Sequence, residues 1–435
     1  EMIMNKPSQD NNQQSPRREF LKTTGAAVAS LGLRTSARAQ SPQTRPAGTI
    51  PEPIRVGIAG GGNFGNSFHC FKDHPDCEIV AVTDLRPKRR ARLMKTYHCG
   101  KAYDSLEEMV EDRRIDAVAI FTDGNLHVDH VVKSMKRGKH VLSAVPAVWG
   151  NYEEADLLYD TVKSSGLTYM MAETAYFSDF TISARKFHRE GRFGEIYHFE
   201  SAYHHPGLEK LYFENGSDGP PWEKGRKTWR HGFPPMFYPT HNIGYFTGVT
   251  GERLVEVTCT GFGDDSPILK DNAYGNPFWN SYGQFVSDKG HTARIDICWK
   301  GPVVSGHPTR WTGTNMSFYA NNHPGSALLP PTLVFQGDGS AKDLSGYGHK
   351  KNSRKRFVQE DWYQTDMLPE PLRVKGGHCN SHPFIVHEFI DALKKGRRPA
   401  VHVAEALAYT VPGIVAHQSA LAGGRRMKIR HYDPL

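Results

Sequence analysis

The chain has few cysteines, and they are not arranged to hold a metal ion or to staple a small fold. Its 435 residues include 6 cysteines, and no two of them show the Cys-x-x-Cys spacing typical of zinc sites and redox motifs. Disulfide frameworks are typical of short secreted chains, whereas this chain is long enough for two or three domains with their own cores. We therefore expect neither a zinc site nor a disulfide scaffold.

Nucleic-acid modules and long apolar runs are also absent. The formal net charge is +8, but no basic stripe is interleaved with stacking aromatic residues, so we expect no nucleic-acid partner. No segment has the roughly 20 consecutive apolar residues of a membrane-spanning helix, so we expect no stable membrane insertion. With 38% hydrophobic and 23% charged residues, the composition is that of a folded globular protein.

The N-terminal residues resemble a twin-arginine export signal. The pair Arg17-Arg18 precedes a short, weakly apolar stretch and then Ala37-Arg38-Ala39, which matches an A-x-A cleavage pattern. We therefore expect a signal peptide over residues 1–39, read by the twin-arginine export machinery, and a proline-rich linker over residues 40–53. The mature protein would then be periplasmic or extracellular. A tail that happens to contain two arginines is the alternative.

The pattern of apolar residues changes near residue 175. Before it, short apolar strands alternate with helical stretches, which predicts parallel β-α-β units and a doubly wound Rossmann sheet. After it, longer alternating strands predict a large, open, mostly antiparallel sheet with helices on one face. We therefore expect an α/β protein with a dinucleotide-binding domain over residues 54–172 and a substrate and oligomerisation domain over 173–435. The expected strands are 55–59, 78–83, 117–121, 140–145, 168–171, 196–202, 255–260, 281–287 and 292–299, and the expected helices are 64–72, 87–97, 105–112, 126–137, 152–164, 384–395 and 403–422. Residues 300–375, rich in Gly, Pro and Asn, predict no clear element.

The first expected strand runs into the glycine fingerprint Gly60-x-Gly62-x-x-Gly65 and then a helix. The first glycine permits a tight turn, the second lets the backbone approach a pyrophosphate, and the third lets the helix pack close to the strand. Asp84, about 20 residues further on, stands where a carboxylate can bind the ribose hydroxyls and repel a 2′-phosphate. The fingerprint with Asp84 therefore predicts NAD, while Arg86 and Lys88 leave NADP as the alternative. The expected export of a folded protein implies that this cofactor is loaded beforehand and tightly bound.

From residue 54 to about residue 430 the sequence resembles the Gfo/Idh/MocA oxidoreductase family. Residues 122–127 match the cofactor-side loop of that family, with Asp123 and Gly124 in place of Pro-Asn. The resemblance implies a second domain with an open sheet, through which members often form homo-oligomers. It implies a cofactor site made of Gly60, Gly62, Asn63, Phe64, Gly65, Asp84, Thr122, His127, Ala144, Val145 and Pro146.

Two departures from the family change the residues that handle protons. The family usually carries Glu-Lys-Pro where this chain has Ala144-Val145-Pro146, so its catalytic lysine is missing. Phe237 stands where most family dehydrogenases have an Asp, four residues before the active-site His, which is His241 here. Hydride transfer from a hydroxyl-bearing carbon still needs a base for the hydroxyl proton. The expected catalytic residues are Tyr238, His241, Tyr176 and His205.

Four local motifs are similar to glycoside hydrolase family 109, whose members are Gfo/Idh/MocA-type glycosidases that keep NAD bound and use it transiently. That family commonly has Glu where Ala144 stands and Asn where Glu173 falls. The motifs are Tyr238-Pro239-Thr240-His241, Val145-Pro146-Ala147, the stretch Met170 to Tyr176, and Ala202-Tyr203-x-His205. The resemblance implies a sugar pocket that includes Tyr203, Arg230, Pro239 and Thr240.

A second group of histidines precedes the C-terminal helices. His378, His382, His387 and Glu388 lack the close spacing of a metal ligand set, and His382-Pro383 is typical of a helix start. We therefore expect no metal here and assign His378 to the substrate pocket, with a metal site as the alternative.

Three functions stay open. The first is an exported NAD(P)-dependent oxidoreductase that takes a hydride from a carbohydrate or polyol. The alternative is an NAD-dependent glycosidase, in which transient oxidation at C3 permits elimination, water addition and re-reduction. The second alternative is a non-catalytic exported sugar-binding protein.

Overall fold

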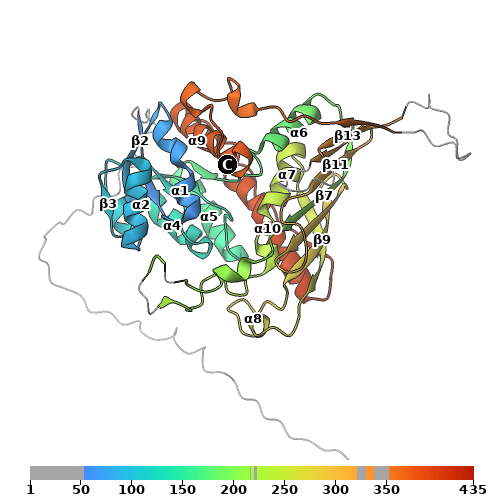
Figure 1. The fold of residues 1–435 in the computed structure, drawn as a ribbon, viewed down its shortest axis with the longest axis horizontal. Coiled ribbons are helices and arrows are strands. Elements are labelled where there is room, and N and C mark those ends of the chain that lie inside the picture. Colours follow the sequence, from blue (N-terminus) through green and yellow to red (C-terminus); the bar gives the residue numbers. More distant parts are fainter. Residues whose placement is uncertain (1–52, 216, 220–222, 321–329, 338–351) are drawn as a thin grey trace, which may run out of the picture. The chain divides into compact units, whose positions relative to one another are not determined.

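The computed structural model describes residues 53–215, 217–219, 223–320, 330–337 and 352–435. The expected signal peptide, and all but the last residue of the expected linker, lie outside the described residues. The described strands form one sheet of six strands and one of nine (Figure 1).

The six-stranded sheet is entirely parallel, in the order β3-β2-β1-β4-β5-β6. This order confirms the expected Rossmann fold, in which ligands bind where the strand order reverses, between β1 and β4. Its strands are β1 (Ile54–Ala59), β2 (Cys77–Thr83), β3 (Ala102–Tyr103), β4 (Ala117–Ile120), β5 (His140–Ser143) and β6 (Tyr169–Met171). The helices between them are α1 (Asn63–Ser67), α2 (Pro87–Tyr97), α3 (Leu106–Val110), α4 (His127–Lys136) and α5 (Tyr152–Ser165).

The single helix expected over residues 64–72 is wrong. The chain forms the short helix α1 and then a 3-10 turn over His69–Asp73, with Phe68 at the junction outside helical geometry. Phe68 and Phe71 are both fully buried.

The nine-stranded sheet has the order β14-β13-β12-β11-β7-β10-β9-β8-β15. Within the described residues only the β7–β10 pair is parallel, which confirms the mostly antiparallel sheet. Its strands are β7 (Ile196–His204), β8 (Leu254–Phe262), β9 (Asn280–Ser287), β10 (Thr292–Cys298), β11 (Thr309–Gly313), β12 (Met316–Ala320), β13 (Thr332–Phe335), β14 (Ser353–Arg356) and β15 (Met427–Lys428). The helices of this half are α6 (Asp179–Arg189), α7 (Thr240–Thr250), α8 (Pro267–Lys270), α9 (Gly377–Lys395) and α10 (Val403–Leu421).

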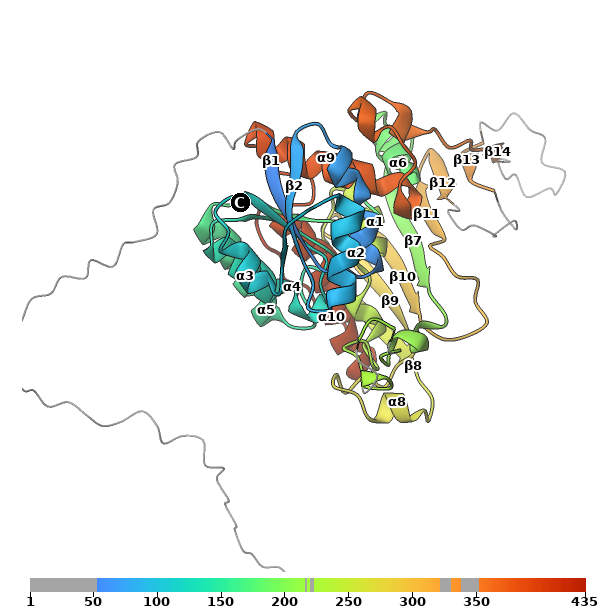
Figure 2. The ribbon, with the colours of Figure 1, turned by 60° about the vertical axis from the view of Figure 1, so that its left-hand side comes forward.

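Helix α10 packs against both sheets. It packs on β8 and β9 of the large sheet and on β6 and α5 of the Rossmann half (Figure 2). A side chain at Gly413 of α10 would overlap the carbonyl oxygen of Met236, just before α7. This glycine therefore lets α10 approach the turn that leads into α7, and so fixes where α7 begins.

All six cysteines are unpaired, and five of them are wholly or partly buried. Among the described residues, no helix is both long enough and apolar enough to cross a membrane.

Buried histidines make the fold sensitive to acid. His417 of α10 packs against the rings of Phe237 and Phe278, and burial lowers its pKa to about 4. An unfolded histidine titrates near pH 6.5, so between about pH 6.5 and 4 the unfolded chain binds more protons than the folded one. Stability from this residue is therefore present above pH 6.5 and is lost as the pH falls toward 4.

We expect His417→Phe to reduce the loss of unfolding free energy between pH 6.5 and 4 by up to about 3 kcal/mol. Urea denaturation at a series of pH values measures this loss. His69→Phe, at an exposed histidine, is the control. An unchanged pH dependence in His417→Phe would contradict the assignment.

Candidate active site

The glycine loop after β1 is shaped by what each glycine meets. Gly60 has a φ of +101°, and side chains at Gly60 or Gly65 would overlap backbone carbonyl oxygens, of Phe121 and Gly60 respectively. A side chain at Gly62 would meet nothing within 4 Å. Gly60 and Gly65 thus let neighbouring backbone segments pack closely, while Gly62 leaves its own backbone open to a ligand. This cradle fits a dinucleotide pyrophosphate.

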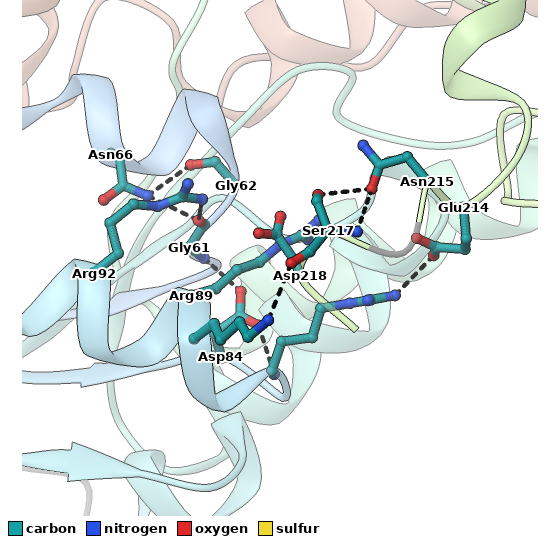
Figure 3. A network of polar contacts seen from close by, with 12 residues as sticks. Gly61, Gly62, Asn66, Asp84, Arg89, Arg92, Glu214, Asn215, Ser217 and Asp218 are labelled. Carbon is teal, nitrogen blue, oxygen red and sulfur yellow. Dashed lines mark hydrogen bonds and ion pairs between the residues drawn. The ribbon is translucent and has the colours of Figure 1, made fainter. Parts of the chain in front are cut away.

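Neighbouring side chains hold the loop in place (Figure 3). Asn66 Nδ2 donates to the carbonyl oxygens of Gly61 and Gly62 at 2.8 and 2.9 Å, and Arg92 donates to the Gly61 oxygen at 2.6 Å. Asp84, just after β2, accepts from the Gly61 N–H at 2.6 Å. The acidic residue picked from the sequence therefore lies directly beside the loop.

The cations behind Asp84 face acids from the large-sheet half of the chain. Arg86 pairs with Glu214 at 2.8 Å and Glu223 at 3.0 Å. Arg89 pairs with Asp218 at 3.0 Å (Figure 3). Sequence reasoning did not find these three acids, because more than a hundred residues separate each of them from its arginine.

The loops after β4 and β5 are joined by His127. Its Nδ1 contacts the Pro146 oxygen at 2.8 Å and its Nε2 contacts the Thr122 oxygen at 3.1 Å. Thr122 Oγ1 contacts His130, while Ala144 and Val145 are buried. These residues lie beside the place where the strand order reverses, between β1 and β4. Of the remaining cofactor candidates, Asn63 is exposed, and Phe64 packs edge-on to Phe121 and His378.

A buried carboxylate holds the histidine at the start of α7. His241 Nδ1 lies 2.6 Å from Glu173 Oε1, with Glu173 0% and His241 8% exposed. The Ala175 N–H also donates to that oxygen, at 2.8 Å. Because Glu173 Oε1 accepts from the Ala175 N–H, a proton on His241 Nδ1 would point to the same oxygen, and this tautomer of the neutral ring leaves Nε2 as an acceptor. This arrangement suits a general base.

Glu173 thus supplies a carboxylate that the family pattern places elsewhere. Phe237, at the family's Asp position, lies in the core against Trp149 and Tyr274. The chain has a buried lysine, Lys139, just before β5, but it donates to the carbonyl oxygens of Asp112 and Ile115. That is the opposite end of the strand from the site, so Lys139 does not replace the missing lysine.

Aromatic rings surround His241. The ring centres of Tyr203 and Tyr238 lie 5.5 and 5.6 Å from that of His241, and His307 stacks on Tyr203 at 4.4 Å. Burial raises the pKa of both tyrosines and lowers that of His307 well below its usual range. Near neutral pH these groups are therefore uncharged donors and acceptors. His307 was missed because it lies in the segment with no sequence pattern.

Two more candidates border this cluster. The ring of His205 lies 5.7 Å from that of Tyr203, and burial lowers its pKa. Arg230 lies over the Trp229 ring at 4.1 Å. A side chain at Gly124 would meet Trp229 at 3.0 Å, so Arg230 lies close to the cofactor-side loop.

Pro239 and Thr240 directly precede His241. Thr240 is fully buried, and its hydroxyl makes no hydrogen bond with the described residues, while Pro239 packs where a side chain at Gly413 would be. Tyr176 lies beside Gly248, about 10 Å along α7 from His241 at 1.5 Å per residue, so the structure places it at the far end of the helix.

The second histidine group is split between different partners. His378 contacts His382 at 2.9 Å, whereas His387 contacts His74 at 3.1 Å, and Glu388 bonds Arg397. In the described part of the chain no three or more His, Cys, Asp or Glu side chains are placed to hold a metal ion. His378 also begins a run of three non-glycine residues with positive φ, a conformation that surrounding contacts must hold.

Residues 54–173 match the model of the Gfo/Idh/MocA family, described as an oxidoreductase family with an NAD-binding Rossmann fold. A glycosyl hydrolase family 109 protein of Saccharopolyspora erythraea is 24% identical over 446 residues, covering 93% of this chain and 91% of that protein. An alpha-N-acetylgalactosaminidase of Bacteroides fragilis is 37% identical over 203 residues, 44% of this chain and 47% of that protein.

Solved structures show the same fold over most of the chain. The scyllo-inositol dehydrogenase of Lactobacillus casei with bound NAD(H) and scyllo-inositol has a TM-score of 0.63 at 17% identity, covering 87% of this chain and 99% of that one. An NAD-binding oxidoreductase of Klebsiella pneumoniae has a TM-score of 0.66 at 15% identity, with 87% and 99% covered. The two-sheet architecture is therefore that of known dehydrogenases.

The different surroundings of two glycines give a prediction. Gly65→Ala should lower the free energy of unfolding by about 1–3 kcal/mol because its Cβ overlaps backbone. Gly62→Ala should leave stability within about 0.5 kcal/mol of the parent and weaken NAD binding about tenfold or more, because the methyl group occupies the open backbone surface. Urea denaturation and calorimetric titration with NAD measure the two effects. Unchanged NAD affinity in Gly62→Ala would show that the cofactor does not approach this backbone.

Proposed function

We propose that this chain, whose residues 54–173 match the Gfo/Idh/MocA family, is an NAD-dependent enzyme that transfers a hydride from a hydroxyl-bearing carbon of a carbohydrate. The observation that carries the proposal is the buried Glu173–His241 pair, together with the open cradle at Gly62. When bound, NAD supplies the hydride acceptor and, in a glycosidase cycle, the donor that returns the same hydride.

The chain itself supplies the proton chemistry. His241 Nε2 takes the hydroxyl proton, and Glu173 compensates the positive charge that then forms on the ring. Tyr203 and Tyr238, kept neutral by burial, donate hydrogen bonds to substrate oxygens. Arg230, which lies over the Trp229 ring, stands on the side of the cofactor loop. The groups around His241 are thus mostly aromatic and uncharged.

A specific observation favours glycoside cleavage as the net reaction. The family 109 relative of Saccharopolyspora erythraea matches 93% of this chain, well beyond the Rossmann domain. In such a cycle oxidation at C3 acidifies the C2 hydrogen, which a base removes as the group on C1 leaves. Water then adds at C1, C2 regains a proton, and the ketone is reduced again. Electrons balance within one turnover, so no external oxidant is needed.

The test uses the purified full chain with NAD in D₂O, incubated with free polyols and with aryl glycosides that include the α-N-acetylgalactosaminide. Aryl alcohol release with deuterium at C2 and no accumulated NADH supports the glycosidase. NADH formation without cleavage supports the simple dehydrogenase. Sugar binding with neither reaction would overturn both and leave a sugar-binding protein.

Variants of the pair should separate chemistry from binding. His241→Ala should lower turnover about 10²- to 10⁴-fold with little change in NAD affinity. Glu173→Gln should also lower turnover and alter its pH profile, because an amide neither fixes the tautomer nor balances the imidazolium charge. His198→Ala, at a histidine paired with Glu200 on β7, is the control. Unchanged turnover in His241→Ala would contradict the assignment of His241 as the base.

We propose further that the site prefers NAD to NADP. Glu214 and Glu223 both pair with Arg86, a cation two residues after Asp84. Asp84 adds a negative charge at the loop. A 2′-phosphate would therefore meet carboxylates and an arginine that is already paired.

Releasing Arg86 should weaken this preference. The double variant Glu214→Gln, Glu223→Gln should bind NADP about tenfold more tightly while its NAD affinity changes little, as measured by calorimetric titration. Glu209→Gln removes an acid of the same segment that makes no ion pair with the described residues, and it serves as the control. Tighter binding of NADP than NAD by the parent protein would contradict the proposal.

Export by the twin-arginine route, a periplasmic or extracellular location and a homo-oligomeric state stay proposals, supported by the Arg17-Arg18 motif and by the family resemblance. Cell fractionation and light scattering of the purified protein check them. A cytoplasmic monomer would contradict them.

A further inference from the structure

A cavity lies between helices α6, α7 and α10. Its volume is about 320 Å³, and it is lined by residues of α6, of the end of α7 and of α10, at the opposite end of α7 from His241. We name it the Arg185 pocket. The residues of its wall used below are Tyr176, Arg185, Arg189, Thr247, Glu405 and Tyr409.

Arg185 is a cation with no acidic partner in this pocket. Its guanidinium donates to the Tyr176 carbonyl at 2.6 Å and lies over the Tyr176 ring at 4.0 Å. It makes no ion pair with any described carboxylate, and burial lowers its pKa. A buried charge of this kind is costly unless it meets a counter-charge. A guanidinium has five N–H donors, so most remain available to a ligand.

Two buried hydroxyl groups in the same wall lack partners. Tyr409 is 0% exposed and Thr247 is 2% exposed. The hydroxyl oxygens of both make no hydrogen bond within the described part of the chain. Buried hydroxyl groups are normally bonded, so two orphans in one pocket indicate a missing acceptor. Gly248 lets the Tyr176 ring and the Tyr409 hydroxyl approach α7 closely, because a side chain there would meet them at 2.7 and 3.4 Å.

The remaining charges leave the pocket positive. The Glu405 carboxylate is engaged by Arg253, which donates to both of its oxygens. Arg189, at the exposed end of α6, adds a second cation to Arg185. The Tyr409 hydroxyl stays protonated, because burial raises its pKa well above the usual range. The wall therefore offers charge and donors to a negatively charged oxygen.

We propose that the Arg185 pocket binds a small oxyanion, a phosphate or a carboxylate, with Arg185 as its charge partner and the hydroxyls of Tyr409 and Thr247 as its donors. The site is separate from the NAD cradle and from the residues around His241. The proposal does not depend on the reaction that the enzyme performs.

The test uses the full chain saturated with NAD, so that the pyrophosphate cradle is filled. Phosphate, sulfate and malonate are titrated at constant ionic strength, with chloride as the reference, and binding is followed by calorimetry and by the melting temperature. We expect one saturable site. Arg185→Gln should weaken binding about tenfold or more, because it removes a charge-assisted hydrogen bond.

A second variant guards against a folding defect in Arg185→Gln. Tyr409→Phe removes only an unbonded hydroxyl, so it should not lower the melting temperature without anion, yet it should weaken anion binding several-fold. Lys186→Gln is the matched control, since Lys186 lies on the same helix but pairs with Glu360 outside the pocket. This control should bind the anion as the parent does.

The relative affinities of phosphate, sulfate and malonate also identify the class of ligand. Preference for phosphate and sulfate indicates a tetrahedral oxyanion, and preference for malonate indicates a carboxylate; both support the site. The proposal is overturned if none of the three anions gives saturable binding, or if chloride binds as tightly at equal ionic strength. It is also overturned if the Tyr409→Phe variant binds the anion as tightly as the parent.

Discussion

The Glu173 carboxylate is fully buried, and both His241 Nδ1 and the Ala175 N–H lie within hydrogen-bond distance of one of its oxygens. Removing the imidazole would leave the buried carboxylate short of one hydrogen bond, a loss that typically costs about 1.5–3 kcal/mol. Glu173 follows the last strand of the Rossmann sheet, and His241 begins the helix that packs on the large sheet. The contact therefore ties the two halves of the chain together at the point where substrate and cofactor must meet.

Short-range signals were sufficient for the Rossmann half. The glycine turn, the strand before it and the acid after β2 are each defined within a few residues, because sterics and strand geometry act locally. The single helix expected over 64–72 is interrupted at Phe68, whose backbone leaves helical geometry. Phe68 and Phe71 are three residues apart, a spacing that would also place both on one face of a continuous helix, so the apolar pattern did not reveal the break.

The active site required contacts between distant residues, which periodicity does not encode. Glu173 and His241 are 68 residues apart, and no local pattern pairs them, because Phe237 occupies the position where the family has its Asp. His307 comes from a segment rich in Gly, Pro and Asn, where no pattern predicts a strand or a direction. Tyr176 was predicted as a site residue from a shared motif, yet its ring lies under the Arg185 guanidinium at the other end of α7. A motif preserves residue type, whereas packing decides which way a side chain faces.

The loss of the lysine and the change at Phe237 have one common explanation. A lysine base needs its pKa lowered far from 10, which burial and nearby charges must supply, whereas histidine titrates near neutral pH without such help. What a histidine base needs instead is a fixed tautomer, and one carboxylate on Nδ1 provides it. Because Glu173 supplies that carboxylate from the segment after β6, no acid is required at position 237. Phe237 instead packs against Trp149 and His417, three residues before α7 begins.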